Sequence, residues 1–180
     1  MNPNLGSLNS LNNLNPNLGS PQAGNAAHFH TSQIRPNLNN LNIINGFRNK
    51  IDDANHSFIG AGTRNTASAD YSFIGGGTCN LTVSGYGSAV VGGTLNTASS
   101  ACSFIGGGCS NKAISSIYSS IVGGRLNCIT GSVYSNIGGG YNNLMSKNSY
   151  YSVIGGGSFN KICEVSLNTQ ILNGFIGSGR

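Results

Sequence analysis

Glycine runs of the kind that can hold a phosphate group recur along this chain. The segment SFIGGGTCN at residues 72–80 returns as SFIGGGCSN at 103–111 and as SVIGGGSFN at 152–160. A phosphate loop needs Gly-Lys-Ser/Thr at the start of a helix, and a dinucleotide site needs a strand–helix–strand unit. No glycine run here is followed by either signal, and a catalytic loop occurs once in a chain rather than many times. The runs therefore predict recurring backbone corners and no cofactor site.

The residues that could act as acids, bases or metal ligands are few and scattered. Of the four acids, Asp52 and Asp53 are adjacent, so on a strand they would face opposite ways. His28 and His30 could offer two imidazoles to a metal ion, but two ligands make a weak site. Serine occurs throughout, so no Ser–His–acid set stands out. We expect a protein that is not an enzyme, with no catalytic or metal site.

Composition narrows the possible partners. The chain has 180 residues, enough for one ordinary domain, and only 7% of them are charged, against about 25% in typical globular proteins. The net charge is +5, but the basic residues form no run, which argues against a nucleic-acid partner. No secretory signal or long apolar segment is present, so membrane insertion is not expected. A place on a cell, spore or virion surface, or outside the cell, would need another route of export.

An internal repeat of 15 to 17 residues extends through the chain from about residue 41. One column of the repeat is asparagine: Asn49, Asn65, Asn80, Asn96, Asn111, Asn127, Asn143 and Asn160. Six residues before each asparagine is a branched aliphatic residue: Ile43, Ile59, Ile74, Val90, Ile105, Ile121, Ile137 and Ile154, with Ile171 as a ninth member. Three residues before each asparagine is a glycine: Gly46, Gly62, Gly77, Gly93, Gly108, Gly124, Gly140 and Gly157, with Gly174 in an incomplete last copy.

The repeat length predicts the fold. A step of about 16 residues is too short for a helical-hairpin repeat and suits one coil of a narrow β-solenoid, stacked at the strand spacing of about 4.8 Å. We therefore predict an all-β fold: a parallel β-solenoid, or β-roll, of about eight to nine coils over residues 41–180. The glycines are predicted to form turns, and the asparagines a ladder of amides bonded to the copies above and below.

Alternation along the predicted strand separates an inward face from an outward face. The aliphatic column and the serine two residues before it would point inward. The residue between them would point outward, together with the residue two positions earlier, which places several aromatic rings on one exposed face. We predict that this face is a subunit interface formed by Phe58, Phe73, Phe104, Tyr71, Tyr118, Tyr134 and Tyr151. The alternative is that the faces are reversed and the rings are core.

Residues 1–40 differ in composition from the rest. This Asn- and Leu-rich segment contains NPNLGS twice and has neither a helical nor a strand period, so it should not form its own core. We predict an extended arm that docks on a neighbouring subunit or a host particle, or else a simple linker.

The five cysteines fall in different columns of the repeat: Cys79, Cys102, Cys109, Cys128 and Cys163. Cys79 and Cys109 lie two coils apart, about 9–10 Å by strand spacing, which is too far for a disulfide. Bridges along the solenoid are therefore not expected. Free thiols and intersubunit cross-links are the two remaining alternatives.

The iterated pattern YSxIGGGxxN, as at 71–80 and 151–160, resembles the glycine-rich β-roll repeats of trimeric autotransporter adhesin heads. Similar arrays occur in bacterial and viral surface or fibre proteins. The resemblance covers roughly residues 41–177 and implies a parallel β-roll that forms a homotrimer and binds host or matrix components. The signal peptide, coiled-coil stalk and membrane anchor of that family are not found in this sequence.

The expected function is therefore that of a structural subunit of a fibre, spike or surface appendage. It would assemble with itself, as a trimer or a polymer, through its β-roll faces and its N-terminal arm. An adhesin-type module that binds a host particle or cell surface is the alternative. Ice binding is a further alternative, because Thr63, Thr78 and Thr94 align in three successive coils before the column changes to Cys109, Arg125 and Tyr141.

Overall fold

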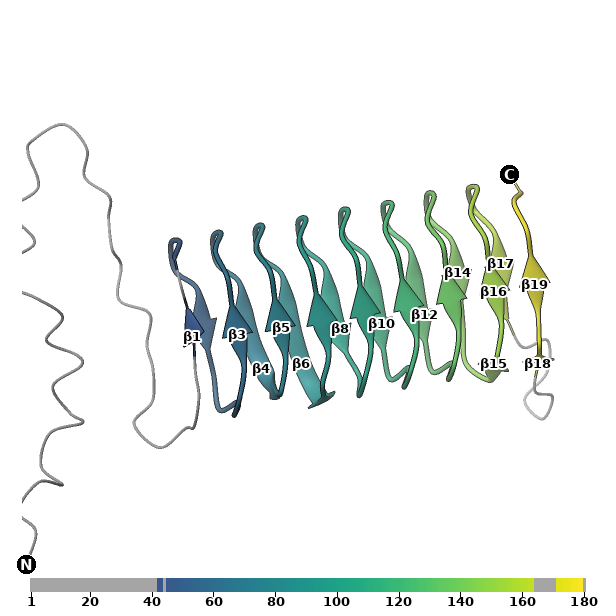
Figure 1. Ribbon diagram of the computed structural model, residues 1–180. Coiled ribbons are helices and arrows are strands. Elements are labelled where there is room, and N and C mark those ends of the chain that lie inside the picture. The colour runs from purple at the N-terminus through teal and green to yellow at the C-terminus, as the bar shows by residue number, and fades with distance from the viewer. Residues whose placement is uncertain (1–41, 44, 164–170, 180) are drawn as a thin grey trace, which may run out of the picture.

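The structure, a computed structural model, describes residues 42–43, 45–163 and 171–179 (Figure 1). The predicted arm at 1–40 lies outside these residues. All regular elements in the described residues are β-strands, most of them only two or three residues long. No helix among them is long and apolar enough to cross a membrane.

The strands form two long sheets and one short one. The first sheet has nine strands: β1 (Asn42–Ile43), β3 (Phe58–Ile59), β5 (Phe73–Ile74), β7 (Ala89–Val90), β9 (Phe104–Ile105), β11 (Ser120–Ile121), β13 (Asn136–Ile137), β16 (Val153–Ile154) and β19 (Phe175–Ile176). The second has eight: β2 (Lys50–Ile51), β4 (Thr66–Asp70), β6 (Leu81–Tyr86), β8 (Thr97–Ser99), β10 (Lys112–Ile114), β12 (Cys128–Thr130), β14 (Leu144–Met145) and β17 (Lys161–Ile162). The short sheet pairs β15 (Ser149–Tyr150) with β18 (Ile171–Leu172).

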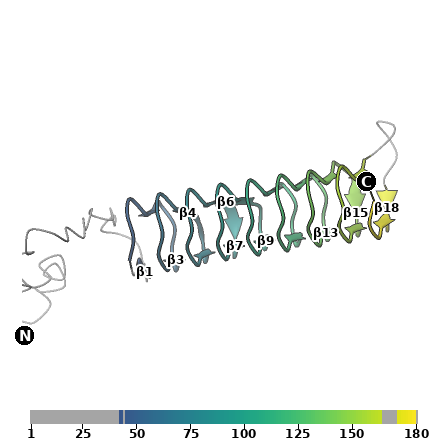
Figure 2. The same cartoon turned by 90° about the horizontal axis from the view of Figure 1, so that it is seen from above.

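Successive coils stack in register, which confirms the predicted solenoid. Each strand pairs in parallel with the equivalent strand of the next coil, as when Ile59 pairs with Ile74 and Ile74 with Val90. The chain alternates between the first and second sheets, and the coils line up along one axis (Figures 1 and 2). Because parallel neighbours lie about 4.8 Å apart, the nine strands extend over roughly 38 Å.

A thin apolar core lies between the two sheets. From Ile59 to Ile154 the aliphatic column of the first sheet is fully buried. Facing it is the column two residues after each asparagine, which is buried as well: Ile51, Ala67, Thr82, Ala98, Ala113, Ile129, Met145 and Ile162. The predicted inward face is therefore confirmed, and the phenylalanines are not core residues.

Glycine forms one corner of each coil, referred to below as the Gly corner. The eight predicted turn glycines from Gly46 to Gly157 have φ between 85° and 111°, a left-handed conformation that side chains disfavour. A Cβ atom at Gly77 would also collide with the carbonyl oxygen of Gly93, and the other seven meet the same obstacle one coil further on. Both constraints require glycine here.

The last copy of the repeat has a different register from the one predicted. Ile154 pairs with Ile176, and Gly157 bridges Gly179, so these residues continue the aliphatic and turn columns. Ile171 pairs with Ser149 in the short sheet. Gly174 falls in the serine column, where its N–H donates to Ser152 Oγ over 3.0 Å. The assignment of Ile171 and Gly174 was wrong because the last coil contains a longer insertion.

The asparagine ladder is present at the predicted positions, but its hydrogen bonds differ from a simple stack of amides. Asn111 Oδ1 accepts the backbone N–H of Asn127 at 3.0 Å. Asn111 Nδ2 donates to the carbonyl of Gly107 in its own coil at 2.8 Å and to that of Gly124 in the next at 2.9 Å. Amide-to-amide bonds occur at only some steps, such as Asn143 to Asn127. Each side chain therefore ties the Gly corner to the next coil, and nearly all of them are buried.

The opposite corner, referred to below as the Ser corner, contains two columns of small residues, which are buried except at Gly85. The predicted serines are buried there: Ser57, Ser72, Ser88, Ser103, Ser119, Ser135 and Ser152. Three residues earlier is a second small column, with Ser100, Ser116, Ser132 and Ser149 following Ala54, Ala69 and Gly85. Ser119 Oγ donates to the carbonyl of Ser132 at 2.8 Å and accepts the N–H of Ser135 at 3.1 Å.

Candidate interaction surfaces

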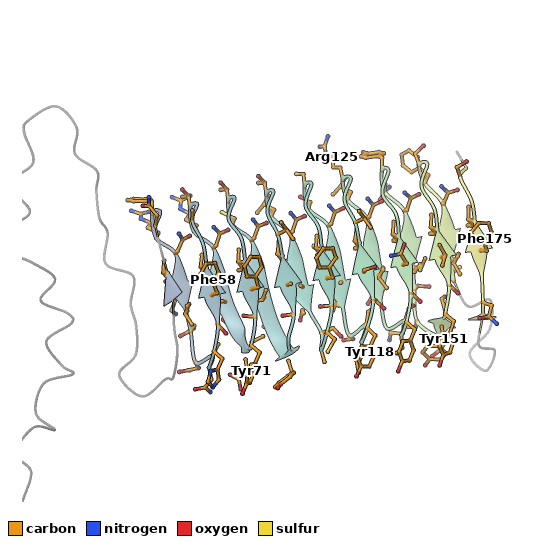
Figure 3. All side chains as sticks on the ribbon, viewed as in Figure 1. Phe58, Tyr71, Tyr118, Arg125, Tyr151 and Phe175 are labelled. Carbon is orange, nitrogen blue, oxygen red and sulfur yellow. The ribbon has the colours of Figure 1, made fainter. Side chains whose placement is uncertain are left out.

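The outer side of the first sheet, here called the Phe face, consists of two outward-facing columns whose members are half-buried or exposed. One column precedes the buried aliphatic residue: Phe58, Phe73, Ala89, Phe104, Ser120, Asn136, Val153 and Phe175. The other follows it: Gly60, Gly75, Val91, Gly106, Val122, Gly138, Gly155 and Gly177. Phe73 and Phe104 are 41% and 39% exposed, which confirms that these rings point outward. Phe58 and Phe175 lie on this face in Figure 3.

Side-chain sizes in the two columns compensate for one another in most coils. Each phenylalanine is followed two residues later by glycine, and its ring covers that position: a Cβ atom added to Gly75 would lie 3.3 Å from the Phe73 ring. In the two coils where the first position is Ala89 or Ser120, the second is Val91 or Val122. In these coils a large side chain at the first position is paired with glycine at the second, and a small side chain at the first position is paired with valine at the second. In the coils of Asn136 and Val153 a medium-sized side chain accompanies glycine, so the exchange holds in the phenylalanine coils and in the Ala89 and Ser120 coils.

Charged side chains are absent from the Phe face within the described residues. Lys50, Lys112 and Lys161 lie on strands of the second sheet, on the opposite side of the roll. Three arginines occupy the Gly corner: Arg48, Arg64 and Arg125, the last of which is labelled at that edge in Figure 3. The roll therefore has one uncharged side and one side that carries charged residues.

The tyrosines do not share the Phe face, contrary to the sequence-based prediction. Tyr71, Tyr118, Tyr134 and Tyr151 lie at the Ser corner with φ near 55°, and Figure 3 shows three of them along one edge of the roll. Strand alternation does not apply at a residue in the left-handed conformation, which explains the error. The same position contains His56, Gly87 and Cys102 in other coils, also with positive φ.

The corner tyrosines form an ordered stack. The ring centroids of Tyr118 and Tyr134 are 5.0 Å apart with planes inclined by 7°, and those of Tyr134 and Tyr151 are 5.1 Å apart with planes inclined by 5°. Tyr71 stacks against His56 at 4.7 Å on one side, and on the other side its ring lies 4.7 Å from that of Tyr86 with the planes inclined by 40°. Cys102 occupies the coil between the two groups. These separations match the spacing of the coils.

The threonine row proposed for ice binding lies at the Gly corner. Thr63, Thr78 and Thr94 form consecutive parallel bridges, as their spacing indicated. The row then continues through Cys109 and on to larger side chains, with the Arg125 guanidinium 5.9 Å from the centre of the Tyr141 ring. The row is therefore short and irregular in size.

All five cysteines are free thiols. Cys79 lies at the Gly corner with φ 55°, a position that Arg64 and Leu95 occupy in the neighbouring coils. Cys128 lies on β12 beside Lys112 of β10. Burial raises the pKa of the Cys128 thiol, and the nearby Lys112 ammonium offsets part of this rise. The structure thus contains no intrachain bridge among the described residues.

Three features of these surfaces were not predicted from the sequence. They are the size exchange on the Phe face, the second column of small residues at the Ser corner, and the left-handed backbone conformation at that corner. The second column of the Ser corner had a sequence signal, a small residue three positions before each serine.

No group of three or more His, Cys, Asp or Glu side chains is placed to hold a metal ion in the described part of the chain. No protein-family model matches this chain, and no curated protein matches it.

Proposed function

We propose that this protein is a non-enzymatic structural subunit of a fibre, spike or surface appendage that assembles with itself through the Phe face. The observation that carries the proposal is an uncharged, partly apolar face that extends along the first sheet, while the charges lie elsewhere. Contiguous exposed apolar surface on a soluble protein typically marks an interaction site.

The use of the repeat residues supports a structural role. Serine and asparagine are the residue types that could act in chemistry, and here the repeated ones are buried. Their hydrogen bonds tie one coil to the next, as with Asn111 and Ser119. Such a ladder gives each coil many bonds to its neighbours and favours a stiff rod.

The size of the face indicates how a second copy would dock. A length of roughly 38 Å and a width of about 13 Å, four residues at 3.3 Å each, give about 500 Å² per copy. Stable interfaces bury about 800 Å² per partner, so the two corners must contribute a rim. The tyrosines would then belong to the solvent-accessible rim of the interface, and the phenylalanines would lie at the centre of the interface.

The symmetry of the assembly follows from the number of faces used. A single face pairs two copies isologously, whereas a trimer needs a second, different surface on each roll. In the trimer suggested by the resemblance, the Phe face of one roll would contact a corner of the next. Both arrangements bury Phe73 and Phe104, so the same substitutions test them.

The proposal is tested by adding one positive charge to either side of the roll. Phe104→Lys places an ammonium at the centre of the Phe face, and Thr97→Lys places one on the second sheet. We expect sedimentation velocity to show oligomers for the unmodified chain and for Thr97→Lys, and a shift toward monomer for Phe104→Lys. Circular dichroism establishes that both variants keep their strands. Equal oligomerisation of the two variants would exclude the Phe face as the interface.

A further inference from the structure

The tyrosine stack at the Ser corner has a geometry that the proposed assembly does not explain. Tyr118, Tyr134 and Tyr151, here called the Tyr row, occupy one position in three successive coils. Their exposures are 55%, 49% and 55%, so solvent and small oxidants reach all three phenols. We propose that the Tyr row is a site of oxidative modification, at which neighbouring phenols of one chain become covalently coupled.

The backbone fixes the spacing of the row. Each tyrosine has φ of 55–56° and donates its N–H to a carbonyl of the preceding coil: Tyr118 to Ala101 at 3.2 Å, Tyr134 to Ile117 at 3.0 Å, and Tyr151 to Val133 at 3.1 Å. The small buried residues on both sides of the corner leave the ring no inward position. The rings are therefore neighbours already in the uncoupled chain, and coupling requires only rotation about the side-chain bonds.

The coupling step balances as a two-electron oxidation. Each of two adjacent phenols loses one electron and its hydroxyl proton, and the resulting phenoxyl radicals carry spin at the Cε carbons. A Cε–Cε bond then forms, the two ring hydrogens leave those carbons, and both hydroxyl groups are restored. The net change is loss of two protons and two electrons, which a peroxide accepts through a haem peroxidase and is thereby reduced to two waters.

Proximity favours coupling within the row over coupling between chains. The partner ring of the same chain is 5.0–5.1 Å away, whereas a ring of a separate chain must first diffuse into place. Holding two reacting groups together is equivalent to a very high local concentration. Tyr134 is the central member, because Tyr118 and Tyr151 lie two coils, or about 10 Å, apart.

The positions of lysine and arginine make the products directly measurable. Trypsin cleaves after Lys112, Arg125, Lys147 and Lys161, so Tyr118, Tyr134 and Tyr151 fall in three different peptides: 113–125, 126–147 and 148–161. The full chain is oxidised with hydrogen peroxide and a haem peroxidase, digested and analysed by mass spectrometry. We expect two cross-linked pairs, 113–125 with 126–147 and 126–147 with 148–161, and fragmentation locates each bond.

Two matched variants test the assignment. Tyr134→Phe keeps the stacked ring but removes the central phenol, and we expect both peptide pairs to fall at least tenfold. Tyr141→Phe removes a phenol from the same tryptic peptide at the Gly corner, and we expect both pairs to stay within twofold of the unmodified chain. Pairs that survive Tyr134→Phe, or that disappear in Tyr141→Phe, overturn the proposal.

Isotope labelling separates this result from the proposed assembly. In an equal mixture of ¹⁵N-labelled and unlabelled chains, coupling within a chain gives pairs of matching isotope, and coupling between chains gives mixed pairs. We expect matching pairs at all protein concentrations, whether or not the chain forms oligomers; a majority of mixed pairs contradicts the proposal.

Cys102, one coil before Tyr118, could return a hydrogen atom to a phenoxyl radical. We therefore expect Cys102→Ser to keep or raise the yield, and a loss of the pairs in this variant would also overturn the proposal.

Discussion

At the scale of single residues, the repeated asparagines and turn glycines act together at one corner. The glycine takes a conformation that brings its carbonyl group toward the asparagine amide of the preceding coil, as Gly124 does for Asn111. The asparagine then receives the N–H of the next asparagine. Each corner is therefore closed by an asparagine side chain and by a backbone carbonyl at a position whose conformation requires glycine.

Substitution of a ladder asparagine should be costly. Asn111→Ala leaves the N–H of Asn127 without its acceptor and removes two bonds to glycine carbonyls. We expect the free energy of unfolding to fall by about 2–4 kcal/mol, measured by chemical denaturation, because buried polar groups lose their partners. The control, Asn136→Ala, removes an amide from the Phe face that bonds Ser120, and should cost less than about 1 kcal/mol. Equal losses would show that the ladder bonds add nothing.

The glycines of a single run should differ sharply in tolerance. Gly108 has φ 87°, and a Cβ there collides with the carbonyl of Gly124, so Gly108→Ala should cost more than about 3 kcal/mol. The preceding Gly107 has open space around it, and Gly107→Ala should change the stability by less than about 1 kcal/mol. Thermal melting of the two variants measures the contrast. A similar loss in both would contradict the assigned corner.

Cys128 should titrate as a shielded thiol. Burial raises its pKa, so less reactive thiolate is present at a given pH, and alkylation should keep accelerating above the pH at which an ordinary thiol levels off. Lys112 lowers the same pKa, so Lys112→Gln should slow the alkylation of Cys128 by iodoacetamide about two- to fivefold below that pH. Mass spectrometry of peptide 126–147 reports the rate. Lys161→Gln, two coils away, is the control, and an unchanged or faster reaction in Lys112→Gln would contradict the prediction.

At the scale of the strand, one of two adjacent residues of the first sheet belongs to the core and the other to the Phe face. Ile121 is fully buried between the equivalent isoleucines of the neighbouring coils, while Val122 is exposed on the Phe face. This alternation is repeated in each coil and separates the core from the interaction surface within a single step of the chain.

Core and face substitutions at this step should therefore have opposite consequences. Ile121→Ala opens a cavity and should lower the free energy of unfolding by about 2–5 kcal/mol. Val122→Ala should lower the free energy of unfolding by less than about 1 kcal/mol. It should instead weaken self-association, because it removes two methyl groups from the Phe face at this coil. Denaturation and sedimentation of the same two samples separate these effects. Loss of stability in Val122→Ala alone would reverse the assigned faces.

The elements that recur in every coil were predictable from the sequence, and those that depend on backbone conformation were not. Asn80 and Gly77 could be placed because each has copies at a constant spacing that matches one turn of the roll. The Tyr row could not, because its position accepts Tyr, His, Cys or Gly and its left-handed φ has no fixed residue signature. The residues of the final coil were assigned wrongly for a different reason. Ile176 lies 22 residues after Ile154, so a prediction based on constant spacing chose Ile171 in its place.

At the scale of the whole molecule, the roll has distinct sides with distinct expected roles. The first sheet presents an uncharged, partly apolar face, the second sheet carries lysines, the Gly corner carries arginines, and the Ser corner carries the stacked tyrosines. A rod built in this way can associate through one side while the others stay in solvent. Because each coil contacts mainly its neighbours, local substitutions should perturb the rod locally.

The molar mass of the unmodified full chain in solution tests the central proposal most directly. Light scattering coupled to size exclusion, repeated over a hundredfold range of protein concentration, measures it without any label or variant. We predict a mass that is a whole multiple of one chain, two for a face-to-face pair and three for a trimer, or a higher mass for a polymer. The mass of a single chain at every concentration would contradict assembly through the Phe face.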